Sequence, residues 1–307
     1  LVTDQEHNSN LILWQRLRDE VGIHLDILKL PDDGSFDLEA LDRALTPETR
    51  LVSLFHTSNL DGRTLPVREI AELVHAHGAR LLVDGCQAAP HLAVDLQKLG
   101  ADYYAVSGHK MLGPTGTGVL AARAPELLRE LRPLIVGGET VEWSTLEAHA
   151  LRGPPHRFEA GLQNYAGIIG AGAAVTYLAR QDLEEVRAHD AALNAYVTRE
   201  LAGRERVHVL GPDSASDRPS IFAFTLDGID PSDGALFLDE SHRILLRSGM
   251  HCVHSWYRAR GLSGNLRASF YLYNDRSDAR ALVHGVGELL DAIPSGGAAP
   301  APPAAAG

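Results

Sequence analysis

Cysteine is scarce in this chain. Its 307 residues include only Cys86 and Cys252, which are too few for a disulfide framework and suit a reducing cytoplasm, where we expect the protein to act. Metal-ligand spacing is also missing, because His75, His77 and the neighbours His251 and Cys252 have no second set of ligands at a usable distance. We therefore expect neither a disulfide-stabilised scaffold nor a metal centre.

Positive charge and long apolar runs are lacking too. The chain has 28 Lys and Arg against 40 Asp and Glu, a net charge of -12, whereas nucleic-acid binding needs clustered Lys and Arg. No stretch approaches the roughly 20 apolar residues that cross a bilayer. Residues 1–7 lack the basic and apolar regions of a signal peptide. We expect neither a nucleic acid nor a membrane as partner.

Strand-like and helix-like segments alternate through the first half of the chain. Apolar runs lie at residues 24–30, 51–55, 81–83, 103–106 and 118–122, and helical patterns at 10–21, 38–45 and 66–77. For the first helix we expect Ser9 or Asn10 as N-cap and Gly22 as terminator. This alternation predicts an α/β fold with a mostly parallel sheet covered on both faces. Because ligands bind beyond the carboxyl ends of such strands, we expect His56, Asp84 and Ser107 at one site.

The pattern changes from about residue 167. Helices are expected at 167–179, 183–201, 232–240 and 277–293, and strands at 207–210, 220–226, 243–247 and 266–273. This mixture indicates a smaller α+β lobe. We predict a large domain over residues 1–177, a small domain over 178–293, and a disordered tail rich in proline and alanine over 294–307.

One lysine is placed for covalent chemistry. Lys110 lies on a tight turn, Ser107-Gly108-His109-Lys110, directly after an apolar strand. An amine there can form a Schiff base with a carbonyl cofactor, most commonly pyridoxal 5'-phosphate (PLP), which usually has an acid beside its pyridine nitrogen. Asp84, at the end of another apolar run, is the candidate acid, although a helix N-cap aspartate has the same sequence appearance.

Other polar residues could complete such a site. Gln87 could reach the phenolic oxygen of the ring, and Asn59 could donate to the same oxygen. Ser107 and His109 could bind a phosphate, and His7 could stack on an aromatic ring. Each is open to a plainer interpretation as a capping, turn or surface residue.

Two residues of the second lobe could act on a substrate. Cys252 follows a strand and a glycine, and a cysteine on a flexible loop near cations can have a lowered pKa and act as a nucleophile. Its alternative is a small core residue. Arg267 could clamp a carboxylate through a bidentate fork, or form a surface salt bridge.

Together these strings resemble the class V aminotransferase-like branch of fold type I PLP enzymes, most closely the Suf-type cysteine desulfurases and selenocysteine lyases. In family order the matching strings are Glu6-His7, His56-Thr-Ser-Asn59, Val83-Asp-Gly-Cys-Gln87, Ser107-Gly-His-Lys-Met-Leu-Gly-Pro-Thr-Gly116, Arg157-Phe-Glu-Ala-Gly161, Arg247-Ser-Gly-Met-His-Cys252 and Arg267-Ala-Ser269.

The resemblance implies a PLP cofactor and a role for each matching residue. Lys110 is similar to the Schiff-base lysine, Asp84 to the partner of the pyridinium nitrogen, and His7 to the catalytic histidine that stacks on the ring. The other cofactor contacts implied are Asn59 and Gln87 at the phenolic oxygen, and Ser107 and His109 at the phosphate.

The resemblance also implies the reaction. Cys252 is similar to the cysteine that attacks the sulfur of L-cysteine and becomes a persulfide while L-alanine leaves, and Arg267, with Asn59, would bind the substrate. Because a thiolate must attack from outside the ring plane, Cys252 is expected on a separate, mobile segment. The sulfur would pass to an acceptor protein for iron-sulfur cluster or thio-cofactor assembly, and the enzyme would be a homodimer.

Two departures from the family affect phosphate binding. Relatives normally carry a further N-terminal segment with a Gly-Thr-Thr-type phosphate loop, so we expect this chain to be a fragment or a truncated product. Leu162 stands where a threonine that reaches the neighbouring subunit's phosphate is usual. Two alternatives follow: a selenocysteine lyase or another carbon-sulfur lyase, and a catalytically silent module for dimerisation or partner binding.

Overall fold

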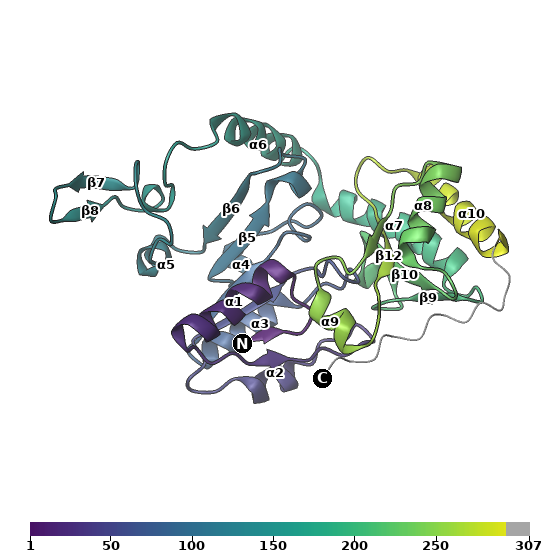
Figure 1. Ribbon diagram of the computed structural model, residues 1–307, viewed down its shortest axis with the longest axis horizontal. Coiled ribbons are helices and arrows are strands. Elements are labelled where there is room, and N and C mark those ends of the chain that lie inside the picture. The colour runs from purple at the N-terminus through teal and green to yellow at the C-terminus, as the bar shows by residue number, and fades with distance from the viewer. Residues whose placement is uncertain (293–307) are drawn as a thin grey trace.

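The computed structural model of the protein describes residues 1–292, and its first half forms a six-stranded sheet (Figure 1). The strand order is β2-β1-β3-β4-β5-β6. The strands are β1 (Val2–Thr3), β2 (Ile27–Leu28), β3 (Leu51–Phe55), β4 (Arg80–Asp84), β5 (Tyr103–Ser107) and β6 (Gly118–Ala122). All neighbouring pairs are parallel except β5 and β6. The predicted α/β fold with a mostly parallel sheet is confirmed.

The helices of this lobe are α1 (Asn8–Val21), α2 (Leu38–Ala44), α3 (Val67–Ala76), α4 (Leu96–Leu99), α5 (Pro125–Glu130) and α6 (Tyr165–Leu178), with 3₁₀ turns at Gly108–Met111 and His156–Phe158. Helical spacing places Val67, Ile70 and Val74 of α3 on one buried face. That face packs against a core that includes Leu54 and Leu81. Successive residues of β3 are buried, as expected for a strand covered on both faces.

Two predictions near the first helix need correction. Helix α1 begins at Asn8 and its N-cap is His7, whose imidazole accepts a hydrogen bond from Ser9 N, so the prediction of Ser9 or Asn10 as N-cap is wrong. The predicted strand 24–30 shrinks to β2, because β1, its only partner strand within residues 1–292, offers two residues for pairing. The predicted terminator of α1, Gly22, is confirmed by its left-handed φ of 77°.

A four-stranded antiparallel sheet, ordered β11-β12-β10-β9, forms the second lobe. Its strands are β9 (Val207–Val209), β10 (Ile221–Leu226), β11 (Arg247–Gly249) and β12 (Asn265–Ser269), with helices α7 (Leu183–Leu201), α8 (Pro231–His242), α9 (His254–Ala259) and α10 (Arg276–Ala292), and a 3₁₀ turn at Ala215–Asp217. Its core includes Phe222, Phe224 and Val197, all fully buried. Figure 1 shows this lobe in green and yellow beside the purple-to-teal first lobe.

One predicted strand of this lobe begins too early in the sequence. The prediction of a strand over 243–247 is wrong, because Arg243 ends α8 in a left-handed conformation and pairing with β12 starts only at Arg247. Ile244 and Leu246 still pack against the core, which explains why their alternation resembles a strand. Helix α9 was not predicted.

A hairpin of β7 (Val141–Ser144) and β8 (His149–Leu151) was also not predicted. It projects from the large lobe in Figure 1. The division of the chain at residues 177 and 178 stays a prediction. The expected tail, 294–307, and Ile293 at the end of the last predicted helix lie outside the described residues.

Over residues 1–292, every helix is too short or too polar to cross a bilayer. Within the same range no three His, Cys, Asp or Glu side chains are grouped as a metal site would require.

Candidate active site

A cavity of about 330 Å³ opens beyond the carboxyl ends of β3, β4 and β5. The predicted cofactor and substrate residues line it: His7, Asn59, Asp84, Gln87, Ser107, His109, Lys110, Cys252 and Arg267. The expectation that His56 belongs to the same site is wrong, because Phe55 and Thr57 on either side of it line the cavity while His56 is buried outside it. His7 of the first lobe and Arg267 of the second lobe therefore line the same cavity. Asp84 and Lys110 also share it, so they do not lie on opposite faces of the molecule.

Asp84 is placed by the glycine that follows it. Its Oδ1 accepts a hydrogen bond from Cys86 N at 2.9 Å, so it caps a turn rather than a helix. A Cβ on Gly85 would lie 1.9 Å from the ring of Tyr104, a distance that no side chain can adopt. The Tyr104 hydroxyl lies 2.8 Å from His56 Nδ1. A bare backbone at residue 85 therefore lets the turn carrying Asp84 pack directly on an aromatic ring.

Lys110 lies in the 3₁₀ turn that follows β5. The turn is closed by hydrogen bonds from Gly108 N to Thr117 O and from Gly113 N to Gly108 O, both 2.9 Å. Burial lowers the pKa of Lys110, although Cys86 and Asp84 act in the opposite direction. A lowered pKa raises the fraction of neutral amine, the form that acts as a nucleophile or base.

His7 is oriented by its role as N-cap of α1. Its Nδ1 accepts from Ser9 N at 3.1 Å, so the ring proton of neutral His7 is on Nε2. Burial and then the positive charge of Lys110 lower the pKa of His7. The side chain is therefore a neutral imidazole with one donor available to the cavity.

Cys252 lies on a loop with an unusual backbone. His251 and Cys252 have φ of 46° and 62°, the left-handed region that residues with a Cβ rarely adopt. The loop was expected to be mobile, but two of its carbonyl groups are anchored. Asn59 Nδ2 donates to His251 O at 2.6 Å, and Asn8 N donates to Cys252 O at 2.7 Å. Because Asn59 spends one amide N–H on this contact, the other remains for a ligand.

Arg267 is buried, with 9% of its surface exposed. Its Nη1 donates to Asn59 O at 2.6 Å, and its Nε has no hydrogen-bond partner among the described residues. The alternative of a surface salt bridge is therefore wrong. Burial, and then Arg247, lower the pKa of Arg267 to about 10. The sequence analysis missed Arg247 as a site residue, yet β11 pairs it directly with Arg267 and it lines the cavity.

Cys86 is a second residue of the cavity that was missed. Its Sγ lies 3.1 Å from Ser107 Oγ. Burial, with Asp84 adding to it, raises the pKa of the Cys86 thiol to about 11. The side chain therefore stays a protonated thiol near neutral pH, which makes it a poor nucleophile. Both cysteines are free of disulfides.

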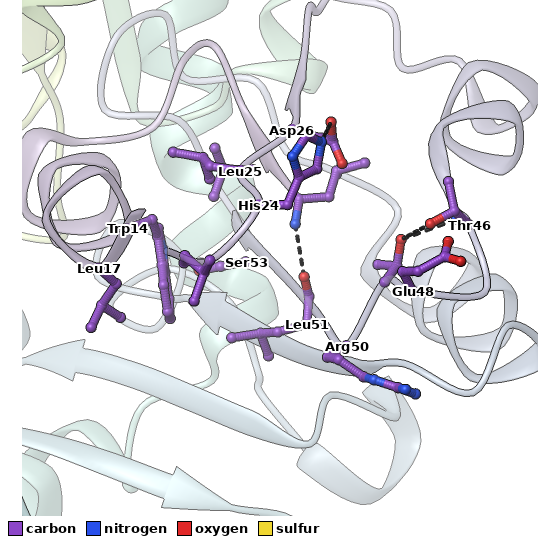
Figure 2. Close-up of a pocket in the computed structure, with 14 residues that line it drawn as sticks. Trp14, Leu17, His24, Leu25, Asp26, Thr46, Glu48, Arg50, Leu51 and Ser53 are labelled. Carbon is purple, nitrogen blue, oxygen red and sulfur yellow. Dashed lines mark hydrogen bonds and ion pairs between the residues drawn. The ribbon is translucent and has the colours of Figure 1, made fainter. Parts of the chain in front are cut away.

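Figure 2 shows another cavity, also about 330 Å³, at the amino-terminal ends of β1 and β3. Trp14, Leu17 and Leu25 provide apolar walls, and the amine of Leu1 donates to Leu51 O at 2.9 Å. None of the predicted site residues lines it. Ligand sites of parallel sheets lie at the opposite ends of the strands.

The residues of the first cavity fit PLP. A volume of about 330 Å³ is within the range of about 300–1,000 Å³ typical of ligand pockets. The cavity offers a carboxylate in Asp84, an amine of lowered pKa in Lys110, and a guanidinium in Arg267. Two buried polar atoms among the cavity residues, Arg267 Nε and His251 Nδ1, have no partner in the described part of the chain.

Comparison with known proteins gives a consistent result. Residues 1–282 match the family model described as Aminotransferase class-V. A probable cysteine desulfurase of Halobacterium salinarum is 40% identical over 288 residues, which cover 94% of this chain and 69% of that protein.

Two solved structures are also similar. The apo cysteine desulfurase of Thermococcus onnurineus superposes with a TM-score of 0.90 at 35% identity, over 95% of this chain and 72% of that one. A C-DES mutant with glycine covalently linked to its PLP cofactor gives a TM-score of 0.80 at 27% identity, over 94% and 73%.

Proposed function

We propose, from the premise that this chain belongs to the aminotransferase class V family of PLP-dependent enzymes, that it moves sulfur from L-cysteine to Cys252 and releases L-alanine. It is a PLP-dependent cysteine desulfurase, like the relatives that it matches over most of its length. The observation that carries the proposal is the meeting of Lys110, Asp84 and Cys252 in one cavity.

The cofactor contacts are those that the family resemblance implies, and their support is that all of these residues line one cavity. Asp84 would hold the protonated pyridine nitrogen, and His7 would lie against the ring. The remaining contacts would be Asn59 and Gln87 at the phenolic oxygen, Ser107 and His109 at the phosphate, and Lys110 at the aldehyde carbon. When bound, PLP accepts electrons from the α-carbon of the substrate.

The substrate is held and activated by residues of this chain. Arg267 binds its carboxylate, since a buried guanidinium with an unused N–H can make charge-assisted hydrogen bonds. The neutral amine of Lys110 takes the α-proton on Nζ, which burial favours by lowering the lysine pKa. His7 Nε2 offers a hydrogen-bond donor within the same cavity.

Sulfur transfer requires a nucleophile outside these contacts. Cys252 Sγ, as thiolate, attacks the substrate sulfur, forming an S–S bond while the substrate C–S bond breaks. The electron pair of that bond stays with the β-carbon, which gains a proton and becomes the methyl group of alanine. Cys86 is held as a thiol by its raised pKa, so Cys252 is the cysteine suited to this step.

The partners and location form a finer part of the proposal. The persulfide sulfur would pass to an acceptor protein that serves iron-sulfur cluster or thio-cofactor assembly in the cytoplasm. A homodimer is supported by the exposed apolar side chains Leu162 and Ile169, which are 85% and 74% exposed on and before α6. Sedimentation velocity measures the dimer directly.

The experiment is alanine formation from L-cysteine by purified protein supplied with PLP. Lys110→Ala and Cys252→Ala should each abolish it, and Lys110→Ala should also remove the visible absorbance of the bound cofactor. Lys98→Ala is the matched control, because Lys98 is 85% exposed on α4. Unchanged alanine formation by Cys252→Ala would show that Cys252 does not accept the sulfur. No alanine from the unmodified chain would favour the silent module.

A further inference from the structure

One residue of the large lobe, Asn8, contacts the loop that carries Cys252 at two points, at Cys252 itself and at His254. The backbone N–H of Asn8 donates to Cys252 O at 2.7 Å. The side chain of the same residue contacts His254, with Asn8 Nδ2 2.8 Å from His254 Nδ1. Asn8 and His254 are 246 residues apart in the sequence, so this contact joins the two lobes.

The loop needs such support because of its backbone. His251 and Cys252 both lie in the left-handed region, and consecutive residues with a Cβ hold that conformation only when surrounding contacts impose it. Val253, the next residue, is fully buried but caps α9 without a side-chain hydrogen bond. The polar contacts around Cys252 include Asn59 on His251 O, Asn265 Oδ1 on the ring of His251, and the two bonds from Asn8.

The side-chain contact also fixes hydrogen-bond roles. Because Asn8 Nδ2 is a donor, His254 Nδ1 must accept, and the ring proton of His254 is on Nε2. An aspartate at position 8 could make the same contact in reverse, by accepting from a protonated Nδ1. An alanine at either position could not.

We propose that Asn8 is the positioning residue for Cys252, acting through a clamp that we define as the Asn8 side chain and the His254 ring. This inference rests on the proposed function, since it assigns the clamp to the sulfur-accepting cysteine. The clamp holds Cys252 Sγ in the cavity that contains Lys110. Neither clamp residue lines the cavity. We therefore expect the clamp to raise the fraction of molecules in which the Cys252 loop is correctly placed, and to leave the affinity for substrate unchanged.

Alkylation tests the clamp without requiring turnover. The PLP-loaded protein is treated with iodoacetamide, and the modification rates of Cys86 and Cys252 are followed separately by peptide mass spectrometry. Cys86 lines the same cavity but lies outside the loop, so it reports any general opening of the site. Variants are Asn8→Ala, His254→Ala, their double mutant, Asn8→Asp as the conservative rescue, and Arg16→Ala as an exposed control on α1.

If the clamp acts as proposed, each alanine variant raises the Cys252 rate about fivefold or more, and the double mutant raises it no further than the larger single effect. The Cys86 rate is unchanged, and Asn8→Asp and Arg16→Ala match the unmodified protein. In the alanine assay, kcat falls by a similar factor while KM for L-cysteine stays within about twofold.

Three results would overturn the proposal that the clamp positions Cys252. They are an unchanged Cys252 rate in both single variants, an equal rise for Cys86 and Cys252, and independent effects that multiply in the double mutant. Failure of the proposed function looks different: the unmodified protein then forms no alanine, while the alkylation pattern still reports on the loop.

Discussion

Acid should destabilise the fold through a histidine beside the candidate site. His56 is 6% exposed, and its Nδ1 lies 2.8 Å from the Tyr104 hydroxyl. Burial, with a smaller effect of Arg187, lowers the pKa of His56 from 6.5 to about 4. The folded protein therefore keeps this imidazole neutral at a pH where the unfolded chain takes up a proton.

The sign and size of the effect follow from linkage. Because the folded pKa lies below the unfolded one, the contribution of His56 to stability is complete above pH 6.5 and is lost as the pH falls toward 4. Each pH unit in that range corresponds to about 1.4 kcal/mol. Between pH 7.5 and pH 5.0, His56 alone should lower the free energy of unfolding by about 2 kcal/mol.

Urea unfolding of the unmodified protein and of His56→Gln at both pH values isolates this contribution. Glutamine keeps a polar group for Tyr104 but takes up no proton. Other groups, such as Glu6, whose pKa burial raises to about 8, act in both proteins and cancel in the comparison. The unmodified protein should lose about 2 kcal/mol more than His56→Gln on acidification. Losses equal within about 0.5 kcal/mol would refute the reasoning.

Four further substitutions test the fold and the site. Gly85→Ala should cost about 3 kcal/mol of unfolding free energy, because its Cβ would overlap the Tyr104 ring. Gly172→Ala, whose Cβ meets nothing within 4 Å in α6, should stabilise by about 0.5–1 kcal/mol in the same urea titration. Asp84→Asn should lower kcat at least about tenfold with the cofactor still bound, since a neutral amide cannot form an ion pair with a protonated pyridine nitrogen. Steady-state alanine formation measures the fall in kcat, and the cofactor absorbance shows whether PLP is still bound. Arg267→Lys should raise KM for L-cysteine about tenfold in the same assay, because an ammonium lacks the bidentate fork, and an unchanged KM would exclude a carboxylate contact.

The positions of Asp84 and Ser107 at the cavity could be predicted because they depend on local pattern. A buried parallel strand is a continuous apolar run, and the first polar residue after it marks the edge of the sheet where ligands bind. Three such strand ends predict where the cavity lies, although the side chain of His56 itself does not line it.

Residues placed by tertiary contacts could not be found in this way. Arg247 reaches the site through the register of β11 against β12, which no local pattern encodes. The cap of α1 was misplaced because His7 uses a ring nitrogen where a hydroxyl or carboxylate is usual. The clamp of Asn8 on His254 joins residues 246 positions apart, so nothing in the neighbourhood of either residue indicates it.

Whether Cys252 receives the substrate sulfur can be measured directly. The PLP-loaded protein is mixed with one equivalent of L-cysteine, quenched with an alkylating agent, and digested for peptide mass spectrometry. One extra sulfur atom should appear on the Cys252 peptide, in proportion to the alanine formed, and none on the Cys86 peptide. Alanine formed with no sulfur on Cys252, or with the sulfur on Cys86, would contradict the assignment.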